Sequence, residues 1–195
     1  MNTNSSTGPV PIIGPLDISN FADRSNFIDF GRILIPNNIP NLVIKGEIEP
    51  DTQRLVAVTL EIANSALQVS VFSTPRSEEI WPEVRSQLAQ TLAAQGAQVV
   101  EETTSLGTGL LVTPGPVSKK AASLTEVTRF VGLDGPRWFL RGSISGAALE
   151  TPAARDEIEA VYRSIVVDRG DDPMPPRELL SLALPAGNVA PPRQI

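Results

Sequence analysis

Three stretches of alternating apolar and polar residues lie in the first half of the chain. They run over residues 42–48, 54–62 and 66–73, and a period of two is typical of half-buried β-strands. The segments between them, residues 49–52 and the pair Asn64-Ser65, are composed of turn formers. The pattern predicts an antiparallel meander of three strands. An earlier apolar stretch, residues 27–35, is expected to be an edge strand or an irregular strap.

The clearest hairpin signal covers residues 126–145. Two runs rich in β-branched and aromatic residues flank Asp134-Gly135, a strong turn pair in which Gly135 is expected at positive φ. A loop at these two residues pairs Val131 with Trp138. Because both faces of the hairpin carry aromatic side chains, we expect it in the middle of the sheet. Residues 99–103 and 109–113 predict a further hairpin.

Apolar residues at helical spacing predict two helices. The first is predicted over residues 78–95, with Ser77 as its N-cap and Gly96 just beyond its end. Pro82 indicates that the residues before it form an irregular lead-in to the first true turn. The second is predicted over residues 152–164 and begins with a Thr-Pro pair.

The order of elements predicts an α+β fold, in which an antiparallel sheet of about six to seven strands is covered by two main helices. We expect residues 1–25 to be disordered or loosely packed, and residues 26–168 to form a single domain. Residues 169–195 are expected to form a proline-rich C-terminal strap and tail. The strap, residues 169–184, carries four leucines that a free tail would not need, so we expect it to pack on the domain or on a second copy of the chain.

Composition excludes several kinds of chemistry. The chain has 195 residues, a net charge of −6, no cysteine and no histidine. It therefore lacks thiolate chemistry, the commonest general base and the commonest transition-metal ligand. The acidic balance argues against nucleic acid and against an anionic membrane surface. No apolar run is long enough to span a membrane, and the first residues do not resemble a secretion signal. We expect a cytoplasmic protein without a cofactor.

Arginine and aromatic side chains supply the candidate binding residues. Arg137 and Arg141 flank Phe139 on one predicted face of the hairpin, and Arg129 lies on the opposite face. Guanidinium groups suit phosphate or carboxylate ligands, although arginines that pair with nearby acids are the more frequent case. Arg177 in the strap is expected at its rim, exposed or paired.

The acidic residues after the second helix give a weaker signal. Asp168, Asp171 and Asp172 could provide oxygen ligands for Ca²⁺ or Mg²⁺. Their spacing lacks the alternating ligands and the terminal Glu of a calcium loop. A solvated acidic turn is the better interpretation, so no metal site and no catalytic residue is predicted.

The element order resembles that of the Mog1/PsbP-like fold, found in photosystem assembly factors and LpqN-type lipoproteins. A second resemblance lies in the residues themselves: TPRSEEIWPEVR (residues 74–85), VGLDGPRWFLRG (residues 131–142) and RGDDPMPPREL (residues 169–179). These segments resemble those of an actinobacterial family known only as a domain of unknown function. The resemblance implies a soluble cytoplasmic protein and brings no catalytic residues with it.

Two functions from different classes follow. The first is a non-catalytic binding or assembly module, in which a sheet face, a sheet edge or the strap holds a protein partner or a second copy of the chain. The second is a binder of a small anionic ligand, or a weak enzyme, around Arg137, Phe139 and Arg141. A groove lined by these three residues favours the second function, and a flat or covered face favours the first.

Overall fold

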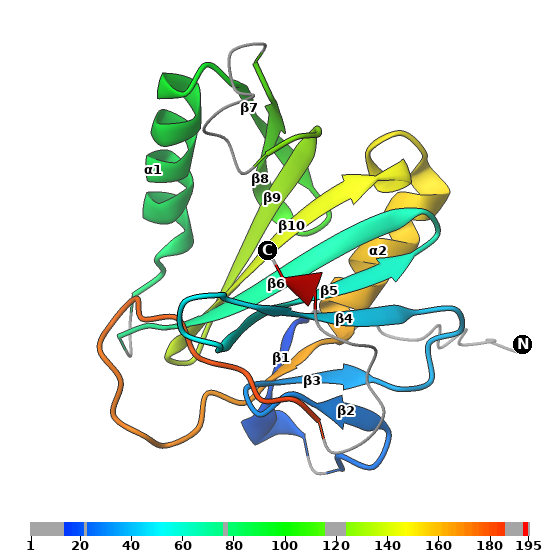
Figure 1. Cartoon of the computed structure of the whole chain (residues 1–195), viewed down its shortest axis with the longest axis vertical. Helices are drawn as coiled ribbons and strands as arrows, with labels where there is room; N and C mark the ends of the chain where they lie inside the picture. The colour runs from blue at the N-terminus through cyan, green and yellow to red at the C-terminus, as the bar shows by residue number, and fades with distance from the viewer. Residues whose placement is uncertain (1–13, 22, 76–77, 116–123, 186–192, 195) are drawn as a thin grey trace, which may run out of the picture.

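A seven-stranded antiparallel sheet forms the centre of the molecule (Figure 1). The computed structural model describes residues 14–21, 23–75, 78–115, 124–185 and 193–194. Strands β4, β5 and β6 form the predicted meander, and β10, β9, β8 and β7 continue the sheet in that order. Together with two α-helices this confirms the α+β fold class. Among the described residues no helix is long and apolar enough to cross a membrane.

The elements have the following bounds: β1 (Leu16–Asp17), η1 (Ile18–Asn20), β2 (Phe27–Asp29), β3 (Ile33–Pro36), β4 (Val43–Ile48), β5 (Leu55–Ile62), β6 (Ser65–Ser73), α1 (Trp81–Ala94), β7 (Gln98–Thr104), β8 (Gly107–Thr113), β9 (Thr128–Gly135), β10 (Trp138–Gly146), η3 (Ala147–Leu149), α2 (Pro152–Ser164), β11 (Val166–Val167) and β12 (Arg193–Gln194). The predicted strands of the meander and both hairpins are present. The second helix coincides with its predicted range.

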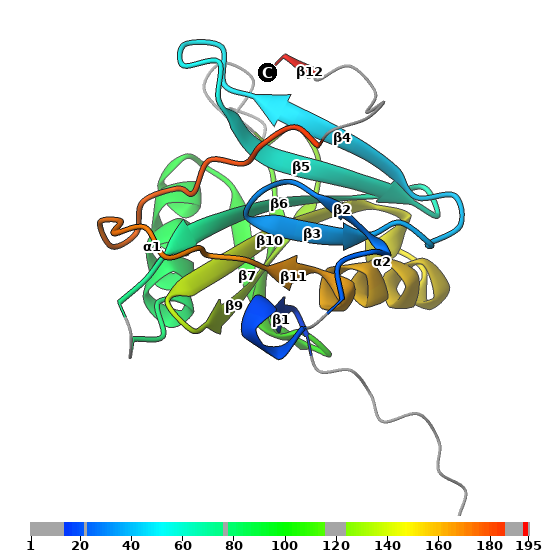
Figure 2. The ribbon, with the colours of Figure 1, turned by 90° about the horizontal axis from the view of Figure 1, so that it is seen from below.

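Alternating residues of the central strands belong to two separate cores. On one face of the sheet, Trp138 and Leu140 of β10 pack with the meander strands, α2 and the small sheet. On the other face, Phe139 and Phe130 pack beneath α1, which covers β7, β8 and β9. The two helices therefore lie on opposite faces of the sheet (Figures 1 and 2). The predicted central position of the β9–β10 hairpin is confirmed.

A small second sheet, in the order β1-β11-β3-β2, packs against the α2 side of the large one. Its β1 strand corrects the expectation of a loosely packed N-terminal segment. The amide of Leu16 donates to the carbonyl of Ile165 over 2.8 Å, and the indole N–H of Trp138 donates to Asp17 over 2.6 Å. Buried donors need acceptors, so this segment is held by long-range bonds that its own composition does not indicate. Residues 1–13 lie outside the described part.

The turn between β9 and β10 also differs from the prediction. Its two loop residues are Pro136 and Arg137, because Trp138 pairs with Gly135 instead of with Val131. Gly135 is extended, and the positive φ of 62° belongs to Arg137. Proline followed by a residue at positive φ is the arrangement of a type II turn. A side chain at Gly135 would overlap the Trp138 indole. The partners shift by an even number of residues, so the assignment of side chains to faces is unchanged.

Helix α1 begins at Trp81 instead of at residue 78, so that Pro82 lies in its first turn, as the position of this proline indicated. Its N-cap is Ile80, which provides no capping side chain. The predicted N-cap, Ser77, lies outside the described residues. Gly96 follows the helix at a φ of 87°, as predicted.

The strap packs on its own domain. The amides of Leu180 and Leu182 donate to the carbonyls of Val71 and Leu55 over 2.9 Å each, and both leucine side chains are buried in the main core. The four leucines differ in their environments, because Leu179 is half-buried and Leu184 is 53% exposed. Beyond the strap, β12 pairs in parallel with β4, and residues 186–192 and 195, part of the expected disordered tail, lie outside the described residues.

Trp138 tests the importance of the central hairpin. Its side chain is 1% exposed, so Trp138→Ala should lower the free energy of unfolding by about 3–5 kcal/mol, through lost burial and an unfilled cavity. Chemical denaturation of both proteins measures the difference. An unchanged midpoint would show that the hairpin is peripheral to the stability of the fold.

Tyr162 provides a pH-dependent test. Burial, to which the charge of Asp134 adds, raises the pKa of the Tyr162 hydroxyl far above its ordinary value. Below pH of about 10 both states hold the proton, whereas above it only the unfolded chain releases it, so stability falls as pH rises. The fall should be steeper than in Tyr162→Phe by about 1.4 kcal/mol per pH unit. Tyr162 is the chain's one tyrosine, so tyrosinate absorbance should appear only on unfolding; its appearance in folded protein would contradict the prediction.

Candidate functional site

Three distant segments meet at one end of the large sheet. They are the start of α1, the β9–β10 turn and the strap (Figure 1). The amide of Thr74 donates to the carbonyl of Arg137 over 3.0 Å, and the amide of Arg177 donates to the carbonyl of Ser73 over 2.7 Å. This end of the molecule therefore brings together the three sequence segments that carry the family resemblance.

The carboxylate of Asp134 caps helix α1 from another element. It accepts hydrogen bonds from the amides of Ile80 and Trp81 over 2.9 and 3.0 Å. The first amides of a helix have no partner within the helix and favour negative charge. Asp134 thus lies in β9 with a long-range role, which explains why it is not a loop residue of the hairpin.

The strap is joined to the same helix by an ion pair. Arg177 contacts the carboxylate of Glu83 with both terminal nitrogens of its guanidinium group. The hydrogen bonds from Arg177, together with its charge, lower the pKa of the Glu83 carboxyl. Both side chains are about half exposed, so the predicted position of Arg177 at the rim is confirmed. An exposed pair of this kind adds little stability.

The three residues proposed for an anionic ligand are not brought together. Phe139 is buried under α1, with its ring stacked on Trp81 at a centroid distance of 5.8 Å. Arg141 lies over the ring of Phe72 at 5.3 Å, and burial lowers the pKa of the Arg141 guanidinium. Arg137 lies in the β9–β10 turn, where it donates to the carbonyl of Gly170 over 3.3 Å. Phe139 is 1% exposed, so it does not line an open groove together with the two arginines.

Arg129 has a structural environment on the opposite face of the sheet, as predicted. It is 3% exposed and pairs with Glu102 of β7. Its Nη1 and the Oε1 of Glu159 in α2 are buried without a hydrogen-bond partner. The Glu102 pair joins β7 to β9 across β8, which is consistent with an arginine that holds strands together.

A polar surface occupies the half of the sheet that α1 leaves uncovered. Its groove has a volume of about 340 Å³ and is lined by β4, β5, β6 and β10 together with the segment before β9. Glu47 accepts hydrogen bonds from Thr59 and Gln68, and Lys45 pairs with Glu61 over 2.6 Å. These polar groups satisfy one another, so the groove shows no residue that is set up for catalysis.

The side chains that hold this end of the molecule together include several that sequence reasoning did not select. Asp17, Arg32, Glu83 and Asp134 each contact an element distant in sequence, and Arg169 donates to the backbone of its own loop. Their position in or beside the three resemblance segments was the available signal for Glu83, Asp134 and Arg169. Among the described residues, no group of three or more His, Cys, Asp or Glu side chains is placed to hold a metal ion.

The fold and this surface define an α+β domain with an antiparallel sheet, one helix on each face and a C-terminal strap. The chain belongs to the family described as a protein of unknown function, DUF3710, whose model matches residues 14–190. The resemblance of the three segments to a family of unknown function is thereby confirmed. No curated protein and no solved structure matches the chain, and the likeness to the Mog1/PsbP-like fold stays a prediction.

The capping role of Asp134 can be tested directly. Asp134→Ala leaves two helix amides without an acceptor and should destabilise the protein by about 1–2 kcal/mol. Asp51→Ala removes an exposed turn carboxylate and serves as a control that should change stability by less than about 0.5 kcal/mol. Chemical denaturation compares the two variants with the wild type. If both variants lose the same small amount of stability, the prediction that Asp134 caps the helix is wrong.

Proposed function

We propose that the protein is a non-catalytic binding module that holds an extended segment of a protein partner along strand β7. The observation that carries this proposal is the edge of the large sheet at that strand, which among the described residues pairs with β8 alone. The order of strands ends at β7 (Figure 1), whereas β12 pairs with part of the opposite outer strand. An outer strand offers a row of backbone donors and acceptors, which partner strands use for β-augmentation.

Strand β7 lacks several of the features that usually protect an edge, although it carries Glu101 and Glu102. It is seven residues long and pairs with β8 in an uninterrupted register from Gln98 to Thr104. It contains no lysine, proline or bulge, which are common devices against unwanted pairing. Val100 is 47% exposed, so the edge also presents apolar surface. These properties support an edge kept open for a partner.

The charges of β7 favour a basic partner over a second copy of the chain. Glu101, an exposed residue that also pairs with Arg85 of α1 over 2.9 Å, lies at the middle of the strand. Antiparallel pairing of the whole strand with itself therefore sets Glu101 opposite its equivalent in the second copy. Like charges directly opposite each other destabilise a strand pair, whereas opposite charges stabilise it. The partner segment is therefore expected to carry Lys or Arg at its centre and to add as an antiparallel strand.

The binding of a small anionic ligand around Arg137, Phe139 and Arg141 receives less support. Phe139 is covered by α1, and Arg141 and Arg137 contact different parts of the chain. The three residues therefore do not form the groove that this function requires. We assign the module to the cytoplasm, which is consistent with a chain that contains no cysteine for disulfides.

Val100→Lys tests the edge, because a charged lysine there opposes a basic partner and blocks close strand pairing. A protein captured with the wild type from cytosol of the source organism is purified, and its affinity is measured for each variant. We expect Val100→Lys to weaken binding by about tenfold, equivalent to about 1.4 kcal/mol. Val43→Lys is the matched control, since Val43 is 46% exposed on β4.

Hydrogen exchange of the purified complex locates the contact. Amides of residues 98–104 should exchange more slowly when the partner is bound, and Val43→Lys should bind as the wild type does. Protection confined to other elements, or equal weakening by both lysine variants, would overturn the proposal.

A further inference from the structure

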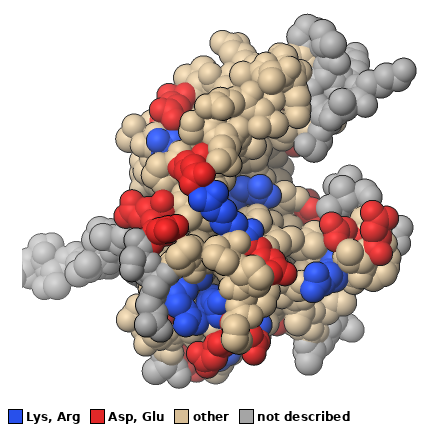
Figure 3. Space-filling model, turned by 90° about the vertical axis from the view of Figure 1, so that its left-hand side faces the viewer, with Lys and Arg blue, Asp and Glu red and all other residues tan. Residues whose placement is uncertain are grey.

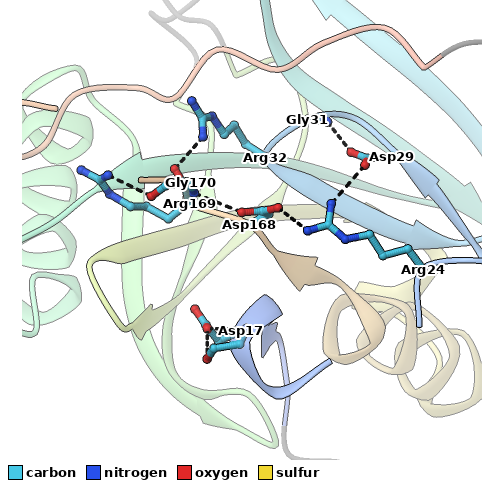
Figure 4. A network of polar contacts seen from close by, with 9 residues as sticks. Asp17, Arg24, Asp29, Gly31, Arg32, Asp168, Arg169 and Gly170 are labelled. Atoms are coloured by element: carbon cyan, nitrogen blue, oxygen red, sulfur yellow. Dashed lines mark hydrogen bonds and ion pairs between the residues drawn. The ribbon is translucent and has the colours of Figure 1, made fainter. Parts of the chain in front are cut away.

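A second feature lies far from β7, in the loop that follows β11. Three arginines converge on its backbone. Arg32 donates to the carbonyl of Arg169 over 2.8 Å, and both Arg137 and Arg169 donate to the carbonyl of Gly170, over 3.3 and 3.1 Å. Figure 4 shows Arg32 and Arg169 pointing to this loop from either side. Gly170 has a φ of 70°, which favours glycine, and a Cβ atom there would overlap the Arg32 guanidinium in its present position.

Two of these positive charges lack a negative partner. Arg32 pairs with Asp172 over 3.1 Å, but within the described part of the chain no carboxylate lies at ion-pair distance from Arg137 or Arg169. Their hydrogen bonds go only to backbone carbonyls, and the Nε of Arg169 is buried without any partner. Partial burial, then the like charges of Arg137 and Arg32, lower the pKa of Arg169. The charges of Asp172 and Asp171 act in the opposite direction without forming an ion pair with Arg169, so its guanidinium is only partly neutralised.

The backbone holds this arrangement at a cost. Arg137 has a φ of 62°, a conformation that is uncommon for residues other than Gly, Asn and Asp. Such a conformation persists only where the surrounding structure imposes it, and it is most frequent at binding and catalytic sites. Here the type II turn directs the Arg137 side chain toward the loop of Gly170.

A hollow of about 690 Å³ opens beside the two arginines, and both of them line it. Three carboxylates line it, those of Asp17, Asp168 and Asp171, and the first two are engaged elsewhere. Asp17 accepts from the Trp138 indole, and Asp168 pairs with Arg24 over 2.8 Å, as Figure 4 shows. On this side of the molecule, basic groups lie next to acidic ones (Figure 3), so the hollow has a surface of mixed charge. Among the described residues that line it, Arg137 and Arg169 are the cations without an ion pair.

We propose that this hollow binds the phosphate group of a small molecule between Arg137 and Arg169. A phosphate monoester carries a charge of about −1.5 to −2 at pH 7 and three acceptor oxygens, enough to serve two guanidinium groups that come from different segments. A carboxylate offers one charge and two oxygens, so it satisfies only one of them. The remaining volume accommodates the rest of the molecule, whose hydroxyl groups face the acidic wall.

The two tryptophans provide a direct test. The indole N–H of Trp138 donates to Asp17 in the wall of the hollow, whereas that of Trp81 donates to the carbonyl of Thr108 over 2.8 Å, in the other core. Titration of the full chain with inorganic phosphate should shift the indole NMR signal of Trp138 and leave that of Trp81 in place. Sodium chloride at equal ionic strength should shift neither signal. An unmoved Trp138 signal, or the same shift with chloride, would overturn the proposal.

Matched variants separate a bound anion from arginines that only support the loop. Arg137→Gln and Arg169→Gln should each weaken phosphate binding by about tenfold or more, the effect of losing a hydrogen bond to a charged group. Arg54→Gln removes an exposed arginine outside the hollow and should bind as the wild type does.

Acetate should bind more weakly than phosphate. Equal effects of all three variants, or acetate binding as tight as phosphate binding, would contradict the assignment. If a glutamine variant does not fold, the titration of the wild type still decides the question.

Discussion

Strand β10 is the constraint on which both cores depend. It lies between β6 and β9, and its successive side chains must point to opposite faces of the sheet. Trp138 therefore enters the core beneath α2, and the next residue, Phe139, enters the core beneath α1. A change in register by one residue would exchange these faces and leave both cores incorrectly filled. The positions of the two helices follow from this single alternation.

The second organising element is the end of the sheet where the strap, the start of α1 and the β9–β10 turn meet. Hydrogen bonds join these segments. Asp134 of β9 accepts from the first amides of α1. The backbone of Ser73 in β6 donates to and accepts from the backbone of the strap. Asp17 accepts from the indole of Trp138 at the same end. Because these bonds join segments distant in sequence, this end is assembled only when the whole chain is folded. The arginine cluster around Gly170 is a product of that assembly.

The two proposed surfaces lie on different elements and depend on different chemistry. Along β7 the interaction uses backbone groups and the acidic character of Glu101. At Gly170 it depends on two guanidinium groups that, among the described residues, are hydrogen-bonded only to backbone carbonyls. An edge strand that selects a basic segment and a hollow that selects an anion can be occupied by different ligands at once. Membership of a family of unknown function is compatible with both.

Local patterns were sufficient for most of the secondary structure. The alternation in residues 42–73 and the helical spacing of residues 152–164 each reflect one buried face, which a strand or helix specifies through its own period. The same alternation correctly placed Arg129 and Arg141 on opposite faces, although the predicted loop was two residues too early. These features depend on neighbours in sequence, so the sequence alone determined them.

The tertiary structure decided what depends on distant partners. Asp134-Gly135 has the stronger local turn signal, but Asp134 caps α1, so the chain turns at Pro136-Arg137 instead. Residues 14–21 are too few to specify a strand by their own pattern and are ordered by β11 and by Trp138. Arg137 and Arg169 meet at Gly170 only because the β9–β10 turn and the loop after β11 lie at the same end of the sheet. The proximity of two guanidinium groups depends on how distant segments pack in the folded chain, and no periodic pattern in the sequence specifies it.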